Sequence, residues 1–89
     1  MSLDLAQLQA LAAAVDTGTF DAAAGRLHVT PSAISQRIRA LENSVGSILL
    51  TRSKPVRVTE AGATYLALAR KIDALTLDAL AAQGSNQPL

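Results

Sequence analysis

Polar and basic side chains recur at helical spacing in the segment that follows Thr30. These side chains belong to Ser32, Ser35, Gln36, Arg39 and Asn43. Glutamine can match the hydrogen-bonding groups of an adenine edge in the major groove of DNA, and arginine can match those of a guanine edge. Residues of these types can read a base sequence if one helix presents them together on a free face.

Thr30 and Pro31 predict where that helix begins. Threonine can accept a hydrogen bond from a free backbone N–H as the N-cap, and proline tolerates the first helical position because its missing N–H would have no partner there. The apolar residues that follow share the opposite face of the helix, at spacings of four, three and four; they are Ile34, Ile38, Leu41 and Val45. Gly46 suits the left-handed residue that ends the helix. One face should therefore pack and the other should bind.

A shorter helix is expected just before this one. Thr19 can cap it, and its inner side carries small or apolar residues, which are Phe20, Ala23, Ala24 and Leu27. The alanines let the next helix cross closely, and Val29 fills the core where the two helices meet. Residues 19–42 therefore indicate a helix-turn-helix, with His28 in a local structural role in the turn.

Two further helices and a wing complete the expected fold. Asp4 should cap a first helix over about residues 5–16, which ends at Gly18. Residues 47–58 contain two short β-prone runs around a basic tip and predict a two-stranded hairpin. Thr59 and Glu60 open a last helix that should reach about Ala82. Its apolar seam alternates spacings of four and three, which is typical of a helix that pairs with another helix; the seam consists of Ala61, Tyr65, Leu68, Ile72, Leu75, Ala79 and Ala82.

The predicted fold is mainly α. A winged helix-turn-helix of three helices and a two-stranded wing should occupy residues 1–58, and a linker or dimerisation helix should occupy residues 59–82. Residues 83–89 are expected to be a linker or the end of a fragment because they are polar and contain Gly and Pro. More protein is expected beyond them.

Composition excludes several classes of protein. The 89 residues are 49% hydrophobic and 2% aromatic, so the core must consist mainly of Ala, Leu, Ile and Val. The chain has no cysteine, which excludes disulfides, and its one histidine cannot build a metal cluster or a catalytic dyad with cysteine. We find no phosphate loop and no paired carboxylates, and we expect no catalytic residue, metal or cofactor. No apolar run approaches the roughly 20 residues that span a bilayer, so we expect a soluble, intracellular protein without membrane contact.

The net charge of +1 is unevenly distributed. Residues 1–25 carry three acidic residues and no basic one, which gives −3. Residues 26–57 carry six basic residues against one acidic residue, which gives +5, and residues 58–89 carry two basic residues against three acidic ones, which gives −1. Positive charge therefore coincides with the expected reading helix and wing, as a surface that binds DNA phosphates requires.

From Leu5 to about Ala82 the chain resembles the N-terminal winged helix-turn-helix and linker helix of LysR-type transcriptional regulators. The resemblance is carried by AAAGRLHVTPSAISQRIRALENSVG and by the later LLTRSKPVRVTEAG. Within that family, SAISQRIRALE and the wing motif are most similar to the branch that regulates basic amino-acid export, ArgP and LysG. The function implied is sequence-specific binding of double-stranded DNA in a bacterial cytoplasm, at the nucleoid.

The resemblance also implies roles for individual residues. Those expected to face bases are Ser32, Ala33, Ser35, Gln36 and Arg39. Those expected to meet the DNA backbone are Thr30, Arg37, Arg52, Ser53, Lys54 and Arg57. Those expected to form the dimer are Tyr65, Leu68, Ile72, Leu75 and Ala79. Many members of the family have glutamine where this chain has Pro31, so Gln36 and Arg39 are expected to carry more of the sequence reading here.

The partners implied are a second copy of the chain, an operator with an interrupted inverted repeat, and RNA polymerase as a further candidate. A small-molecule effector such as lysine or arginine would bind a C-terminal domain outside these residues. Three alternatives stay open on the residues alone. The basic residues could only solvate a surface, the seam could dock on its own domain, or the chain could be a helix-pairing module with non-specific DNA affinity.

Overall fold

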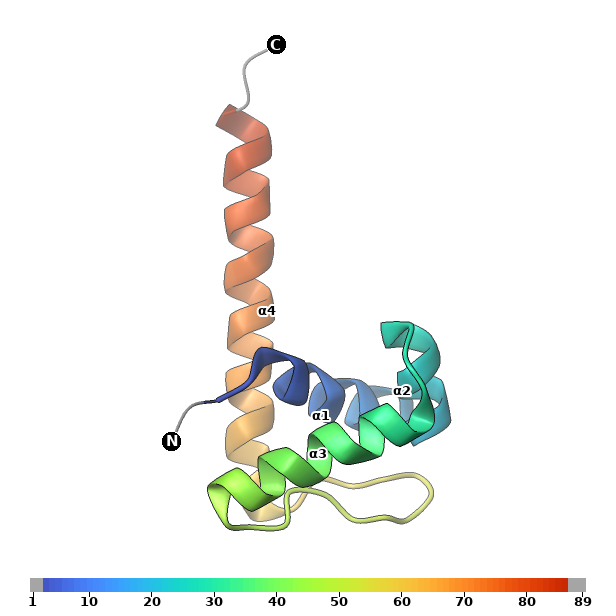
Figure 1. Ribbon diagram of the computed structural model, residues 1–89. Coiled ribbons are helices and arrows are strands. Elements are labelled where there is room, and N and C mark those ends of the chain that lie inside the picture. The colour runs from blue at the N-terminus through green and yellow to red at the C-terminus, as the bar shows by residue number, and fades with distance from the viewer. Residues whose placement is uncertain (1–2, 87–89) are drawn as a thin grey trace.

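The computed structural model describes residues 3–86, with side chains up to residue 83. It contains four helices in this range, which are α1 (Leu5–Thr17), α2 (Phe20–Leu27), α3 (Pro31–Val45) and α4 (Glu60–Asn86). The first three form a small domain, and α4 extends from that domain as a long single helix (Figure 1). The mainly α fold of the prediction is confirmed.

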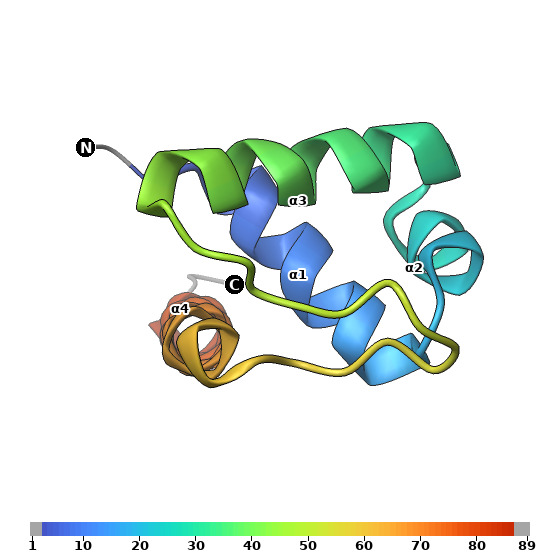
Figure 2. The same ribbon diagram turned by 90° about the horizontal axis from the view of Figure 1, so that it is seen from below.

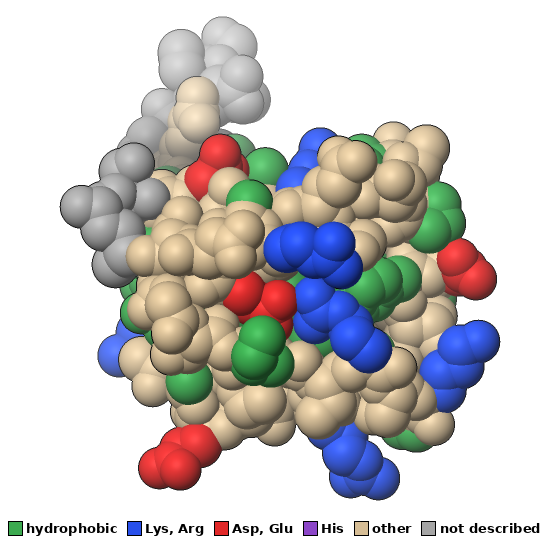
Figure 3. All heavy atoms as spheres, turned by 60° about the horizontal axis from the view of Figure 1, so that its bottom comes forward, with side chains coloured by type: hydrophobic (Ala, Val, Ile, Leu, Met, Phe, Trp, Pro, Cys, Tyr) green, Lys and Arg blue, Asp and Glu red, His purple; other side chains and the backbone are tan. Residues whose placement is uncertain are grey.

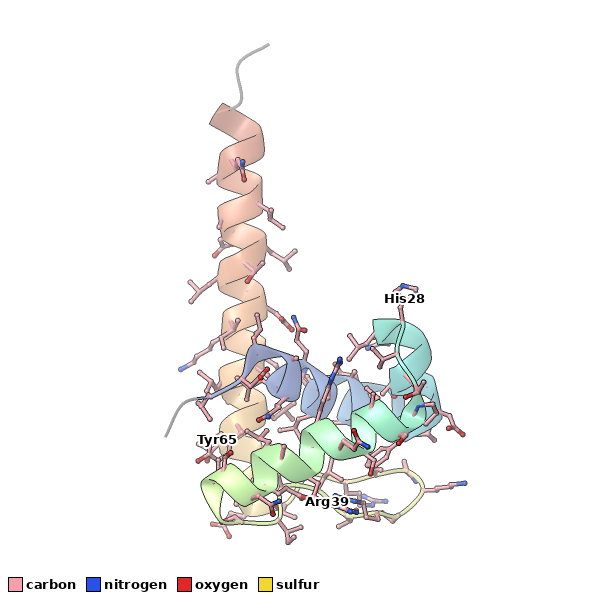
Figure 4. All side chains as sticks on the ribbon, in the orientation of Figure 1. His28, Arg39 and Tyr65 are labelled. Atoms are coloured by element: carbon pink, nitrogen blue, oxygen red, sulfur yellow. The ribbon has the colours of Figure 1, made fainter. Side chains whose placement is uncertain are left out.

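The helix boundaries follow from local capping. The side chain of Asp4 accepts a hydrogen bond from the N–H of Ala6 at 2.8 Å, and Thr30 Oγ1 accepts one from the N–H of Ala33 at 3.1 Å. Gly18 and Gly46 adopt positive φ values of 88° and 77° and end α1 and α3. His28 ends α2 in the same left-handed region, with φ 57°, and Figure 4 shows its side chain pointing away from the domain, far from Arg39. His28 therefore has a local structural role, as expected, and that role is to end α2 as its C-cap.

The core forms around α1, which packs against all three other helices. Its largest fully buried side chains come from α1, α3 and the segment after α3; they are Leu8, Leu11, Ile34, Ile38, Leu41, Leu49 and Leu50. Between them, alanines such as Ala10, Ala14 and Ala23 are buried where helices approach closely. A core of small aliphatic residues thus holds the two helices of the helix-turn-helix at fixed positions.

The two-stranded wing of the prediction is wrong. Among the described residues there is no strand, and Leu50 and Val58 form a single antiparallel bridge. The ladder ends at this bridge because Arg57 N–H donates to Thr51 Oγ1 at 3.0 Å instead of to the Thr51 carbonyl. Val56 N–H lies on the outer side of the segment and donates to the Gly18 carbonyl at 2.9 Å. We call residues 51–57 the wing loop; in Figure 2, which views the molecule from below, it runs alongside α3 and passes in front of α1.

The wing loop is closed mainly by side-chain hydrogen bonds. Thr51 N–H donates to the Arg57 carbonyl at 2.8 Å, and the hydroxyls of Thr51 and Ser53 lie 2.7 Å apart. Ser53 Oγ also donates to the Pro55 carbonyl at 2.9 Å. These bonds hold the tip of the loop without a regular hairpin.

The lower half of α4 packs on the domain and the upper half does not. Ala69 is buried, while Tyr65, Leu68 and Ile72 pack partly buried against the core. Farther along, the exposed apolar residues are Leu75, Leu77 and Leu80, with exposed fractions of 68%, 66% and 59%. The first part of the seam, up to Ile72, therefore docks on its own domain, and the part from Leu75 onward does not.

An ion pair holds α4 against α1, and α4 extends past its predicted end. Asp16 at the end of α1 accepts a hydrogen bond from Arg70 of α4 at 2.9 Å and lies 3.9 Å from Arg26 of α2, and it raises the pKa of Arg70. The helix continues through residues 83–86, past the expected end at Ala82, because a glycine costs a helix only about 1 kcal/mol. The remaining residues of the expected tail, 87–89, lie outside the described residues.

Candidate nucleic-acid interface

The outer face of α3 presents side chains that make no hydrogen bond within the described part of the chain. Ser32, Gln36 and Arg39 are exposed, and Ala33 and Ser35 are partly exposed. The side chains of Gln36 and Arg39 have neither a hydrogen bond nor an ion pair among residues 3–86. The opposite face carries Ile34 and Ile38, which are fully buried. A rigid, packed helix therefore holds free donors and acceptors outward.

Basic side chains gather on the face that α3 shares with the wing loop (Figure 3). Arg39 comes from α3 and lies on the side of the wing loop (Figure 4). The wing loop contributes the exposed side chains of Arg52, Lys54 and Arg57. An open groove of about 700 Å³ separates the C-terminal half of α3 from the wing loop, and Arg39, Asn43, Thr51 and Arg52 are among its lining residues.

The predicted backbone-binding residues differ in how free they are. The side chains of Lys54 and Arg57 are exposed and make no hydrogen bond or ion pair among residues 3–86. Ser53 and Thr30 already use their hydroxyls within the protein, to the Pro55 carbonyl and the Ala33 N–H. Arg37 lies about 200° around α3 from Arg39, so it flanks the exposed face on the side away from the wing loop.

Arg52 is tied to the protein by an ion pair that the sequence did not reveal. Its Nη2 lies 2.9 Å from Glu42 Oε1 and its Nη1 lies 3.4 Å from Glu42 Oε2. Glu42 is only 5% exposed, and its Oε2 also accepts a hydrogen bond from Leu49 N–H at 2.8 Å. The guanidinium stands 5.6 Å above the centre of the Phe20 ring. Glu42 and Arg52 therefore join α2, α3 and the wing loop.

Burial and hydrogen bonding act in opposite directions on the pKa of Glu42. Burial acts to raise its pKa, but the hydrogen bonds from Arg52 and from the backbone N–H groups of Leu49 and Leu50 outweigh burial and hold the pKa below its ordinary 4.5. The carboxylate form is therefore the one that the fold stabilises. One sequence signal could have found it, since Glu42 is the only acidic residue among the six basic ones of residues 26–57.

Acid should weaken the fold through Glu42. The folded state lowers the pKa of Glu42 below its ordinary value of 4.5. The charged pair therefore contributes its full stability above pH 4.5 and loses it as pH falls through the lower pKa of the folded state. We expect Glu42→Gln to be less stable than wild type at neutral pH, and the difference should shrink by about pH 3. Urea unfolding at both pH values measures this, with Asp78→Asn, an exposed carboxylate on α4, as control. A difference that stays constant with pH would contradict the assignment.

The predicted dimerisation residues are split between two environments. Tyr65, on the part of α4 that adjoins the domain (Figure 4), packs partly buried against the core together with Leu68 and Ile72. Leu75 and Ala79 are exposed on the part of α4 that extends beyond the domain.

Comparison with known proteins decides the family. Residues 5–63 match the profile of the bacterial regulatory helix-turn-helix proteins of the lysR family. The chain belongs to the LysR family. The match covers α1, the helix-turn-helix, the wing loop and the start of α4, which are the elements that form the basic face.

Named relatives within the LysR family regulate transcription. The chain is 56% identical over 87 residues to the HTH-type transcriptional regulator LysG of Mycobacterium tuberculosis, which covers 98% of the chain and 29% of LysG. It is 47% identical over 72 residues to the HTH-type transcriptional regulator ArgP of Cronobacter sakazakii, over 81% of the chain and 24% of ArgP. The chain thus spans less than a third of the length of these relatives.

Two solved structures of the LysR family match this fold. A complex of the CbnR DNA-binding domain with DNA has a TM-score of 0.79 at 33% identity and covers 93% of this chain and 97% of that one. Full-length LysG of Corynebacterium glutamicum with bound effector Arg has a TM-score of 0.81 at 38% identity and covers 98% of this chain and 31% of that one.

The chain is therefore the DNA-binding domain of a LysR-type transcriptional regulator and not an enzyme. Among residues 3–86 no helix is both long enough and apolar enough to cross a membrane. The same residues contain no cluster of three or more side chains that could hold a metal ion.

Proposed function

We propose that this domain binds an operator sequence-specifically, with α3 in the major groove and the wing loop against the neighbouring backbone. The observation that carries this proposal is the exposed face of α3, on which Gln36 and Arg39 have hydrogen-bonding groups without a protein partner. Ser32, Ala33 and Ser35 lie around them and complete the reading surface. Arginine and glutamine at such positions distinguish guanine and adenine from other bases.

Backbone contacts are assigned to residues around this surface. Lys54 and Arg57 supply unpaired positive charge from the wing loop, and Arg37 supplies it from the flank of α3. Thr30 and Ser53 stand at the start of α3 and at the tip of the wing loop. Such contacts position the protein on the duplex, and the bases then specify the sequence.

Two copies are proposed to act together through α4. Leu75 and Ala79 remain exposed on the half of the helix that its own domain does not cover, and an apolar face of this kind favours helix pairing. A two-fold dimer would place two copies of α3 on an inverted repeat with a spacer between its halves. The similarity to LysG of Corynebacterium glutamicum, a lysine export transcriptional regulatory protein, supports control of basic amino-acid export genes. Lysine or arginine is the proposed effector, since a solved structure of that relative contains bound Arg. We also propose that the regulator acts at the nucleoid of a bacterial cytoplasm, with RNA polymerase as a further partner.

Selection of bound duplexes from a random-sequence pool tests the proposal. We expect one enriched half-site that recurs in inverted orientation, because half-site geometry mirrors the two-fold axis of the protein. Recovery without any enriched sequence would instead support the alternative, a helix-pairing module with non-specific DNA affinity. That alternative draws on the exposed leucines of α4.

Gln36→Ala should relax the base preference at one or two positions of the half-site. A lost bidentate base contact typically costs about 1–3 kcal/mol of discrimination. Repeating the selection with the variant measures the change. Asn43→Ala, on the same face nearer the end of α3, is the matched control, since it should affect the preference less. A base preference identical to wild type would rule out Gln36 as a reading residue.

Lys54→Gln should weaken binding to all sequences to a similar extent. A phosphate contact releases counterions, so the slope of log affinity against log salt should fall by about one unit in magnitude. Titration of enriched and scrambled duplexes over a range of salt measures both effects. If the variant changed which sequence is preferred, Lys54 would read bases and the assignment to the backbone would be wrong.

A further inference from the structure

Arg52 lies on the basic face, but its positive charge is paired with the carboxylate of Glu42. Its guanidinium donates to both carboxylate oxygens of Glu42, at 2.9 and 3.4 Å, and to the Leu50 carbonyl at 3.4 Å. Glu42 is only 5% exposed, so solvent competes little with Arg52 for its carboxylate. The pair is close to electrically neutral, whereas Lys54 and Arg57 in the same loop have no partner among residues 3–86.

Arg52 also connects three elements. It reaches Glu42 on α3, stands 5.6 Å above the Phe20 ring on α2, and belongs itself to the wing loop. It lines both the groove beside α3 and a second hollow of about 240 Å³ that lies between the start of α2 and the tip of the wing loop. In a loop that lacks a β ladder, such a side chain sets the position of the loop relative to the reading helix.

We propose that Arg52 is a positioning residue for DNA binding, which fixes the wing loop to α2 and α3, and that Glu42 rather than a DNA phosphate is the partner of its charge. This inference rests on the proposed function. Arginine is required because its planar fork can bond both oxygens of one carboxylate and stack on an aromatic ring, and lysine can do neither in the same way. Substitution should therefore loosen the wing loop, so that ordering it on DNA costs free energy, while Lys54 and Arg57 still reach the phosphates and no ionic contact to DNA is removed.

The salt dependence of binding separates positioning from phosphate contact. We would measure the affinity for the duplex recovered from the random pool over a range of salt, for wild type, Arg52→Gln, Arg52→Lys and the comparison variant Lys54→Gln. Both Arg52 variants should lose about tenfold in affinity at every salt concentration, which corresponds to about 1.4 kcal/mol, with a slope equal to that of wild type. Lys54→Gln should lose about one unit of slope.

The opposite result would overturn the proposal. If Arg52→Gln lowered the slope as Lys54→Gln does and Arg52→Lys restored wild-type binding, Arg52 would be a phosphate ligand. Affinities equal to wild type in both Arg52 variants would equally exclude a positioning role. Wild type that bound no duplex even at low salt would refute the proposed function itself, so the two failures are distinguishable.

Glu42→Gln provides a second arm that does not alter Arg52. Glutamine can still accept the hydrogen bond of Leu49 N–H, so the loop keeps that attachment while the negative charge is lost. The charge of Arg52 then becomes unbalanced on the basic face, and the salt slope should rise by up to about one unit. A slope unchanged from wild type would show that the charge of Arg52 was already engaged by DNA and would overturn the proposal. Thermal unfolding of each variant confirms that it is folded at the temperature of the titration.

Discussion

Gly62→Ala should destabilise the domain by about 3 kcal/mol or more, enough to unfold much of the chain at moderate temperature. Gly62 is buried in the first turn of α4, where this helix crosses the segment before the wing loop. A Cβ at this position would overlap the Leu49 carbonyl oxygen and would lie 2.7 Å from Val58 Cγ2. No side chain can occupy that space unless backbone moves.

The surrounding hydrogen bonds prevent that movement. The Leu49 carbonyl accepts from Thr59 N–H at 3.0 Å, and Leu49 N–H donates to Glu42. On the helix side, Gly62 N–H donates to the N-cap Thr59 at 3.0 Å. Shifting either backbone therefore breaks the cap of α4 or the attachment of the wing loop.

Thermal unfolding followed by circular dichroism measures the effect. A loss of about 3 kcal/mol should lower Tm by roughly 12–24 °C in a domain of this size. Gly25→Ala is the matched control, because Gly25 is an exposed position of α2 with no atom within 4 Å of an added Cβ. That change should stabilise α2 by up to about 1 kcal/mol. A Gly62→Ala variant as stable as wild type would show that α4 does not cross the chain as closely as described.

Leu75→Glu should reduce affinity for a duplex with two half-sites by roughly 100-fold or more and leave affinity for one half-site almost unchanged. Leu75 is 68% exposed, so its loss costs the folded domain little. In the proposed dimer it lies in the helix pair, where a buried glutamate without a partner is strongly unfavourable. Separation of the two copies removes the gain from binding two half-sites at once.

Leu77→Glu is a closely matched control. Leu77 is 66% exposed on the same helix and receives the same charge, but it lies about 200° around α4 from Leu75. We expect this variant to remain dimeric in sedimentation equilibrium and to bind the two-half-site duplex as wild type does. Equal behaviour of the two variants would contradict the proposed seam, and loss of the dimer in Leu77→Glu alone would place the pairing surface on the other side of α4.

Several parts of the fold were predictable because their causes are local. Thr30 caps α3 through the N–H of Ala33, only three residues away, and Gly46 ends the same helix by adopting a positive φ. The periodic apolar residues of α3 could meet a core on one side only, which left Gln36 and Arg39 exposed. The resemblance to LysR-type regulators predicted the family, and the match of residues 5–63 to the LysR family confirmed that prediction.

Other parts depended on contacts that sequence spacing does not encode. The β-prone runs of residues 47–58 indicated a hairpin, but Arg57 N–H, which would continue its ladder, donates to the side chain of Thr51 instead. The sequence offered Arg52 as one of the basic residues expected to meet the DNA backbone, and its pairing with Glu42 became visible only in the folded chain. The seam of α4 was regular throughout, yet the domain is long enough to cover only its first half.

The sequence alone therefore determined which segments are helical, where they begin and which face of α3 is free, because capping and periodicity act over one or two turns. The tertiary structure decided the form of the wing, the neutralisation of Arg52, the requirement for glycine at position 62 and the exposed part of α4. Each of these depends on which backbone groups and side chains meet across long separations in the chain, and that meeting is set by the packing of α1 with the other three helices.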